Sequence, residues 1–237
     1  MKTFFALLRQ FLSPTLLAPT TPVFDDEAAA RKARSIEILR SEEVKYINHL
    51  PVIETVEESL RRTEEEVVQR AIALVIVAAK GDTGDHALAQ SLVRQFEADV
   101  FFTPEEQAFM GNPEPTENDR IQFVWRYEAA HVLFWAMGIY HDLGHPDAVT
   151  DGPHLVATLR DLGPNGLRAK AQLRPQAEIL DAADLIYRYH WTIVDARVNE
   201  MPVPPSLNPN VVYERHYTLN WLIGSGGPAW DDISTDT

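Results

Sequence analysis

Helix signals dominate the pattern of apolar and polar positions along the chain. The most apolar stretch runs from Ala71 to Ala79 and is flanked by Arg70 and Lys80. A helix rises about 1.5 Å per residue and a bilayer core needs about 20 apolar residues, so this stretch predicts a buried core helix and not a membrane span. No run alternates with a period of two for long enough to form a sheet. The pattern therefore predicts an all-α fold: a single compact multi-helix domain with no substantial sheet.

Local signals mark where several of these helices begin and end. Thr63 and Glu66 form a capping box, in which each side chain satisfies a free backbone amide of the other residue. Thr103 followed by Pro104 is a second start signal, because proline is favoured at the first helical position. The predicted helices span residues 25–40, 63–80, 85–98, 103–111, 116–137, 154–162, 175–199 and 210–223. Prolines between residues 201 and 209 predict an extended linker before the last helix.

The first part of the chain differs from the rest. Its short apolar run is interrupted by Arg9 and Gln10, and Pro14 and Pro19 follow, which is unlike a cleaved signal peptide. We therefore expect residues 1–24 to form an amphipathic or flexible N-terminal segment and residues 25–237 to form the helical domain.

Three of the predicted helices carry ionisable residues on faces that are otherwise apolar. Glu128 and His131 interrupt one such face, His190 and Arg197 interrupt a second, and His216 interrupts a third. Buried charges are costly unless they are paired, so we expect these side chains to meet in one interior location.

Charged residues near these positions alternate with aromatic rings, which have an apolar body and a polar tip suited to a wet, partly buried pocket. Asp231 and Asp232 follow Trp230, and we expect them to fold back onto arginines in bidentate geometry. The candidate pocket or network consists of Arg126, Glu128, Arg188, His190, Glu214, Arg215, His216, Asp231 and Asp232. Two interpretations stay open: an ion network that fixes the register of the helices, and a binding or catalytic pocket.

Composition narrows the classes of function. The chain of 237 residues has 21 basic and 35 acidic side chains and a net charge of −14. This charge argues against a nucleic-acid ligand and an anionic membrane surface, and it favours a protein partner with a basic surface. The absence of cysteine excludes disulfides, thiolate metal sites and a thiol nucleophile, and it fits a cytoplasmic protein. No signature of a bound cofactor stands out, and the sequence does not indicate the oligomeric state.

The segment from His141 to His145 offers a competing hypothesis. Its adjacent His141 and Asp142 look like the metal-binding core of HD-type phosphohydrolases, in which a metal ion activates water. His131 lies about 15 Å from His141 along an intact helix, so the missing ligands would have to come from His86 and from Asp184 or Asp195.

The aromatic strings and several other motifs also carry a family resemblance. These are His49-Leu50-Pro51-Val52-Ile53, Ala78-Ala79-Lys80-Gly81, Thr103-Pro104-Glu105-Glu106, Trp125-Arg126-Tyr127-Glu128-Ala129, Leu173-Arg174-Pro175, the runs 178–197 and 211–223, and Trp230-Asp231-Asp232 with Thr235-Asp236-Thr237. Over residues 44–237 the chain resembles the DUF4272 family of proteins of unknown function. The resemblance implies no reaction, substrate or cofactor, but it implies that the strings belong to the family pattern.

The leading hypothesis from the sequence is an acidic helical protein that acts by binding another molecule. The alternative is an enzyme that uses Glu128, His190, Glu214 and His216 as acid–base groups, with Arg126, Arg188 and Arg215 holding an anion. The third is the metal-dependent hydrolase at His141 and Asp142.

Overall fold

The most apolar segment of the chain forms the central helix of the structure, α2 (Glu64–Thr83). The structure is a computed structural model and describes residues 23–225 and 229–237. From Ala71 to Ala78, every side chain of α2 is fully buried, because neighbouring helices cover α2 on all sides. The prediction of a core helix at this position is therefore confirmed.

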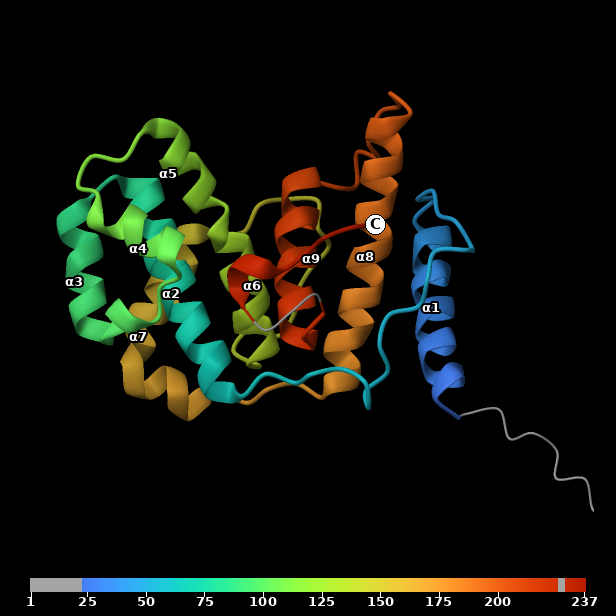
Figure 1. Ribbon diagram of the computed structural model, residues 1–237, viewed down its shortest axis with the longest axis horizontal. Coiled ribbons are helices and arrows are strands. Elements are labelled where there is room, and N and C mark those ends of the chain that lie inside the picture. The colour runs from blue at the N-terminus through green and yellow to red at the C-terminus, as the bar shows by residue number, and fades with distance from the viewer. Residues whose placement is uncertain (1–22, 226–228) are drawn as a thin grey trace, which may run out of the picture.

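Two groups of helices lie on either side of α6 (Arg126–Ala136) (Figure 1). Around α2 are α3 (His86–Phe96), α4 (Pro104–Gly111), α5 (Glu117–Val124) and α7 (Gly152–Lys170). On the other side, α8 (Gln176–Val198) packs along α9 (Pro209–Ile223) and α1 (Val23–Ser41). Two short 3-10 helices, η1 (Ala98–Val100) and η2 (Trp230–Asp232), complete the described elements.

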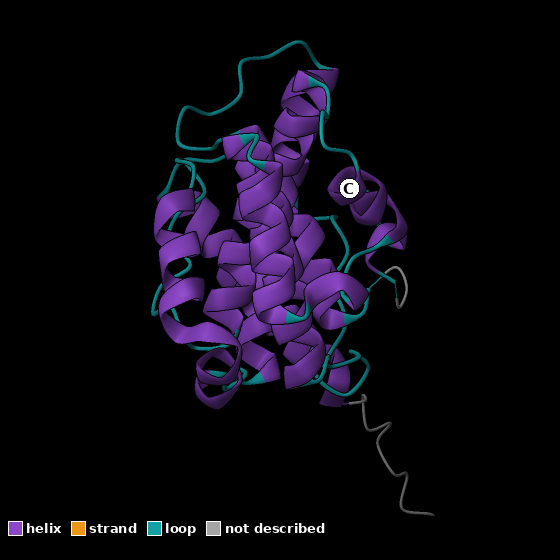
Figure 2. Ribbon diagram, turned by 90° about the vertical axis from the view of Figure 1, so that its left-hand side faces the viewer, coloured by secondary structure: helices purple, strands orange, loops and turns teal. Residues whose placement is uncertain are grey.

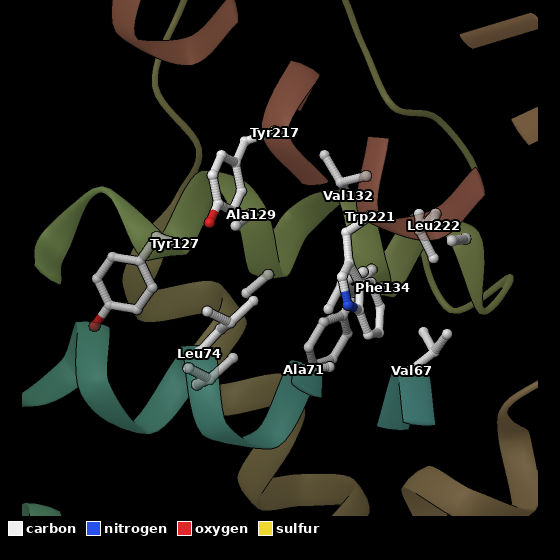
Figure 3. Close-up of a cluster of buried hydrophobic side chains, with 14 of the residues drawn as sticks. Val67, Ala71, Leu74, Tyr127, Ala129, Val132, Phe134, Tyr217, Trp221 and Leu222 are labelled. Carbon is white, nitrogen blue, oxygen red and sulfur yellow. The ribbon is translucent and has the colours of Figure 1, made fainter. Parts of the chain in front are cut away.

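One continuous core joins the two groups. In Figure 3, Leu74 of α2, Val132 and Phe134 of α6, and Trp221 and Leu222 of α9 belong to the same cluster of buried apolar side chains. The described residues contain no strand (Figure 2). The predicted all-α, single-domain fold is thus confirmed. None of the described helices has the length and apolar character that crossing a membrane requires.

The prediction of one continuous helix over residues 116–137 is wrong, because the structure contains two helices there, α5 and α6. The two helices are divided at Trp125, whose backbone N–H bonds the carbonyl of Phe123 and so leaves the regular helical pattern. Helix α5 packs so closely on α2 that a Cβ added to Gly81 would lie 2.7 Å from a backbone oxygen of α5. The division leaves Ile121 half exposed while Glu128 is buried, so the predicted common face does not exist.

Other predicted boundaries are close to the observed ones. The capping box of Thr63 and Glu66 is present, and Thr103 begins α4 in the same way. Helix α7 is longer than the predicted 154–162, and it changes direction at Gly163, whose φ of 63° suits glycine. Most of the predicted N-terminal segment, residues 1–22, lies outside the described residues, and α1 begins at Val23.

Candidate functional site

Helix α9 presents three consecutive ionisable side chains to different neighbours. Successive residues of a helix point about 100° apart, because one turn contains about 3.6 residues. Glu214 and Arg215 accordingly reach α6, whereas His216 reaches α8. These three side chains are buried, whereas Arg197 of α8 is exposed, contrary to the prediction. The expected single meeting point is also wrong, since the structure separates the buried side chains into distinct groups.

The first group consists of two ion pairs between α6 and α9. Arg126 Nη1 lies 2.9 and 2.8 Å from the two carboxylate oxygens of Glu214, and Arg215 Nε lies 3.6 Å from Oε2 of Glu128. Burial raises the pKa of Glu214 and Glu128, and the facing arginines oppose this rise. Each arginine therefore faces a carboxylate of the other helix.

Arg188 forms a separate pair on α8. Its guanidinium donates to both carboxylate oxygens of Asp184, at 2.8 and 2.6 Å, and to the backbone oxygen of Pro51. Arg188 therefore faces the α1–α2 connector (residues 42–63) and does not join the histidines or α9.

The two aspartates of η2 do not reach these arginines, so their predicted bidentate pairing is wrong. Asp231 and Asp232 are exposed, and a hydrogen bond joins Asp231 to the side chain of Thr103. Partial burial raises the pKa of Asp231 and the charge of Arg70 opposes this rise, but Arg70 forms a buried ion pair with Glu106. The sequence showed Arg70 only as a flank of the apolar run, and nothing in the spacing indicated its partner.

The second group is a buried pair of histidines between α8 and α9. His190 Nδ1 lies 2.9 Å from Nδ1 of His216, and the amide nitrogen of Asn220 lies 3.1 Å from the other ring nitrogen of His216. Because this amide donates, His216 accepts at Nε2 and carries its proton on Nδ1. The Nδ1–H of His216 then donates to Nδ1 of His190. His190 carries its own proton on Nε2 and donates it to the backbone oxygen of Thr235.

Both rings of this pair are neutral at neutral pH. Burial lowers the pKa of His190 to about 4 and that of His216 to about 3. The charge of Arg197 adds to the lowering for His190, and His190 adds to it for His216. Burial similarly lowers the pKa of His131, which bonds Thr150 and the backbone of Leu143, to about 4.

A cavity of about 600 Å³ lies beside His216. Residues of the α1–α2 connector, α8, α9 and the C-terminal tail (residues 229–237) line it, and the end of the tail lies next to α8 and α9 (Figure 1). Its lining residues are Val52, Ile53, Glu54, Glu58, Tyr187, His216, Asn220, Ile223, Ser225 and Asp236. Three carboxylates and no lysine or arginine are among these described lining residues, so we name it the acidic cavity.

A second cavity of about 300 Å³ lies beside His190. Arg197 and Tyr213 contribute to it, and Asp236 contributes to both cavities. The tail therefore lies between the two cavities, over the histidine pair. The sequence did not place Glu54 or Asp236 in the candidate site, because connector and tail residues carry no periodic signal.

The alternative metal motif is not assembled. His141 and Asp142 bond each other on a loop, with side chains 95% and 83% exposed. Asp184 is paired with Arg188, and Asp195 is paired with Lys45. Within residues 23–225 and 229–237, no three histidine, aspartate or glutamate side chains are grouped so that they could hold a metal ion. The hydrolase hypothesis therefore lacks its ligand set.

The fold and these groups define an all-helical protein with buried, neutralised ion pairs and an acidic cavity. The chain belongs to the family described as a domain of unknown function (DUF4272), which matches residues 31–233. This match confirms the resemblance inferred from the motifs. No curated protein and no solved structure matches the chain.

Proposed function

We propose that this protein acts by binding a protein partner with a basic surface, and that the acidic cavity receives a lysine or arginine of that partner. The observation that carries this proposal is the lining of the cavity, which contains Glu54, Glu58 and Asp236 and, among the described lining residues, no lysine or arginine. The net charge of −14 attracts the same kind of partner over a longer range. The absence of cysteine suits a cytoplasmic setting for this function.

The cavity can keep its negative charge at neutral pH. Glu58 accepts hydrogen bonds from the backbone N–H and the hydroxyl of Thr55, and these bonds lower its pKa. His216 adds no positive charge, because burial holds its pKa at about 3. Tyr187 gives the cavity an aromatic side chain, which can contact the apolar stem of a lysine or arginine.

A fluorescently labelled hexa-arginine peptide tests this proposal by anisotropy titration at low salt. The double variant Glu54→Gln/Glu58→Gln should weaken binding by about tenfold, because a charged hydrogen bond contributes about 1.5–3 kcal/mol and these groups are partly exposed. A matched control is Glu57→Gln/Glu114→Gln, which removes the same charge from exposed positions outside the cavity. Equal losses in the two double variants would show that only the net charge attracts the peptide.

An acid–base enzyme is a second candidate, and the histidine pair favours it. The hydrogen bonds fix both tautomers, so a proton accepted at one end of the pair can be passed to the other ring. The proposed anion-holding role of Arg126, Arg188 and Arg215 receives no support, because each is paired with a carboxylate. A small-molecule thermal-shift screen that gives hits on the wild type and on His216→Gln alike would count against this candidate.

A further inference from the structure

The tail is anchored at one end and loosely held at the other. Trp230 and Ile233 are buried, and the hydroxyl of Tyr217 donates to the backbone oxygen of Trp230. Beyond Ile233 the contacts are few: the amide of Asn220 donates to the backbone oxygen of Ser234 at 2.8 Å, and His190 bonds that of Thr235. Residues 234–237 are therefore held over the histidine pair mainly through their backbone.

The charge of the tail does not suit the cavity that it borders. Asp236 lies in the same lining as Glu54 and Glu58, so it adds a third carboxylate to the acidic cavity. Among the described residues, no lysine or arginine forms an ion pair with Asp236. A basic side chain at the position of Asp236 would face Glu54 and Glu58 in the acidic cavity, whereas Arg197 lines the cavity on the other side.

Building on the function proposed above, we propose that residues 234–237 occupy the binding position of an extended basic peptide segment of the partner, which enters by displacing them. The backbone oxygens of that segment take the hydrogen bonds that Asn220 and His190 give to Ser234 and Thr235. Its lysine or arginine takes the position of Asp236 and faces Glu54 and Glu58. Since Asp236 lines both cavities, its departure joins them into one groove along α8 and α9.

The displaced segment ends at Ile233. The side chains of Ile233 and Trp230 belong to the hydrophobic core, so moving them would expose apolar surface to water. Residues 234–237 bury little apolar surface, and their release costs mainly two backbone hydrogen bonds. The tail is thus a weak competitor that a better-charged peptide can replace.

A single introduced thiol reports the position of the tail, because the chain contains no cysteine. Thr235→Cys keeps the backbone oxygen that His190 bonds, and the rate of its modification by a thiol reagent measures how often the tail opens. Saturating hexa-arginine peptide should raise this rate by about threefold or more. Ser91→Cys on the exposed surface of α3 is the control, and its rate should not change with the peptide.

Reversing the charge of the tail gives an independent test. Asp236→Lys should hold the tail against Glu54 and Glu58, slow modification of Thr235→Cys, and weaken peptide binding by about tenfold. Glu57→Lys makes the same change in net charge outside the cavity and should weaken binding by no more than about twofold.

The outcomes separate this proposal from the one on which it depends. Peptide binding that depends on Glu54 and Glu58 but leaves the modification rate unchanged would overturn displacement of the tail and keep the proposed function. No binding of the peptide to the full chain at low salt would overturn both. Faster modification together with a loss of binding specific to Asp236→Lys would support displacement.

Discussion

Acid should destabilise this protein through its buried histidine pair, and replacing one ring should remove part of that effect. His216 is 1% exposed and bonded on both ring nitrogens, so a second proton would place a charge in the interior and displace the hydrogen bond from Asn220. Its pKa is about 3 in the folded chain and 6.5 as an unperturbed side chain. The unfolded chain therefore takes up a proton on this ring as the pH falls below 6.5, whereas the folded chain does not.

The sign and size of the effect follow from this difference in proton binding. Where the unfolded state binds more protons than the folded state, lowering the pH lowers the free energy of unfolding. For one group this loss is about 1.4 kcal/mol per pH unit. His216 alone should therefore cost about 3 kcal/mol over the two pH units below 6.5. Folded proteins are stable by about 5–15 kcal/mol, so a loss of this size is measurable.

Other groups titrate in the same range, so the total pH dependence is not diagnostic. His131 and His190 add to the loss, while Glu128 and Glu214 oppose it because burial raises their pKa. Comparison with His216→Gln at each pH isolates the contribution of His216, since glutamine keeps a polar side chain but does not titrate.

The assay is urea unfolding followed by tryptophan fluorescence between about pH 7 and pH 4.5. The wild type should be the more stable protein at pH 7, and its advantage should shrink by about 1.4 kcal/mol per pH unit below 6.5. His49→Gln removes an exposed imidazole from the α1–α2 connector and is the control for the substitution itself. A difference between the wild type and His216→Gln that does not change with pH would refute the neutral buried pair.

Two further predictions concern packing and charge in the interior. Arg126→Ala should cost about 3–5 kcal/mol in urea unfolding because it leaves Glu214 buried without its partner, whereas Arg126→Met/Glu214→Met should cost clearly less. Similar losses in both would argue against an uncompensated buried charge. Gly81→Ala should lower the free energy of unfolding by about 1–3 kcal/mol, because the added Cβ would press against α5. Gly111→Ala is the control: its added Cβ would have no atom within 4 Å, so the same assay should show no loss.

Most of the fold could be predicted because helix signals are local. The caps at Thr63 and Thr103 depend on residues three positions apart, and they mark helix starts that the structure contains. The break at Trp125 could not be predicted in this way. No proline or glycine marks it, and it accompanies the close packing of α5 on Gly81, a contact between residues distant in sequence.

The candidate site was predictable only in part, for a related reason. Helical spacing shows which face of a helix is buried, so it placed Glu128, His190 and His216 inside. It does not show which helix covers that face, so it could not assign partners or separate the ion pairs from the histidines. The acidic cavity depends on Glu54 and Asp236 from non-helical segments, for which no periodic pattern exists.

The arrangement on α9 also constrains how the length of this helix can vary. Inserting one residue between Val211 and Glu214 would rotate the following side chains by about 100° relative to the start of the helix. Arg215 would then turn away from Glu128 and His216 away from His190, so a single insertion would break both contacts at once. Insertions of about seven or about eleven residues, close to two or three full turns, would restore the facing directions. Homologous sequences should therefore vary in length in the linker before α9 and keep the spacing within the helix constant.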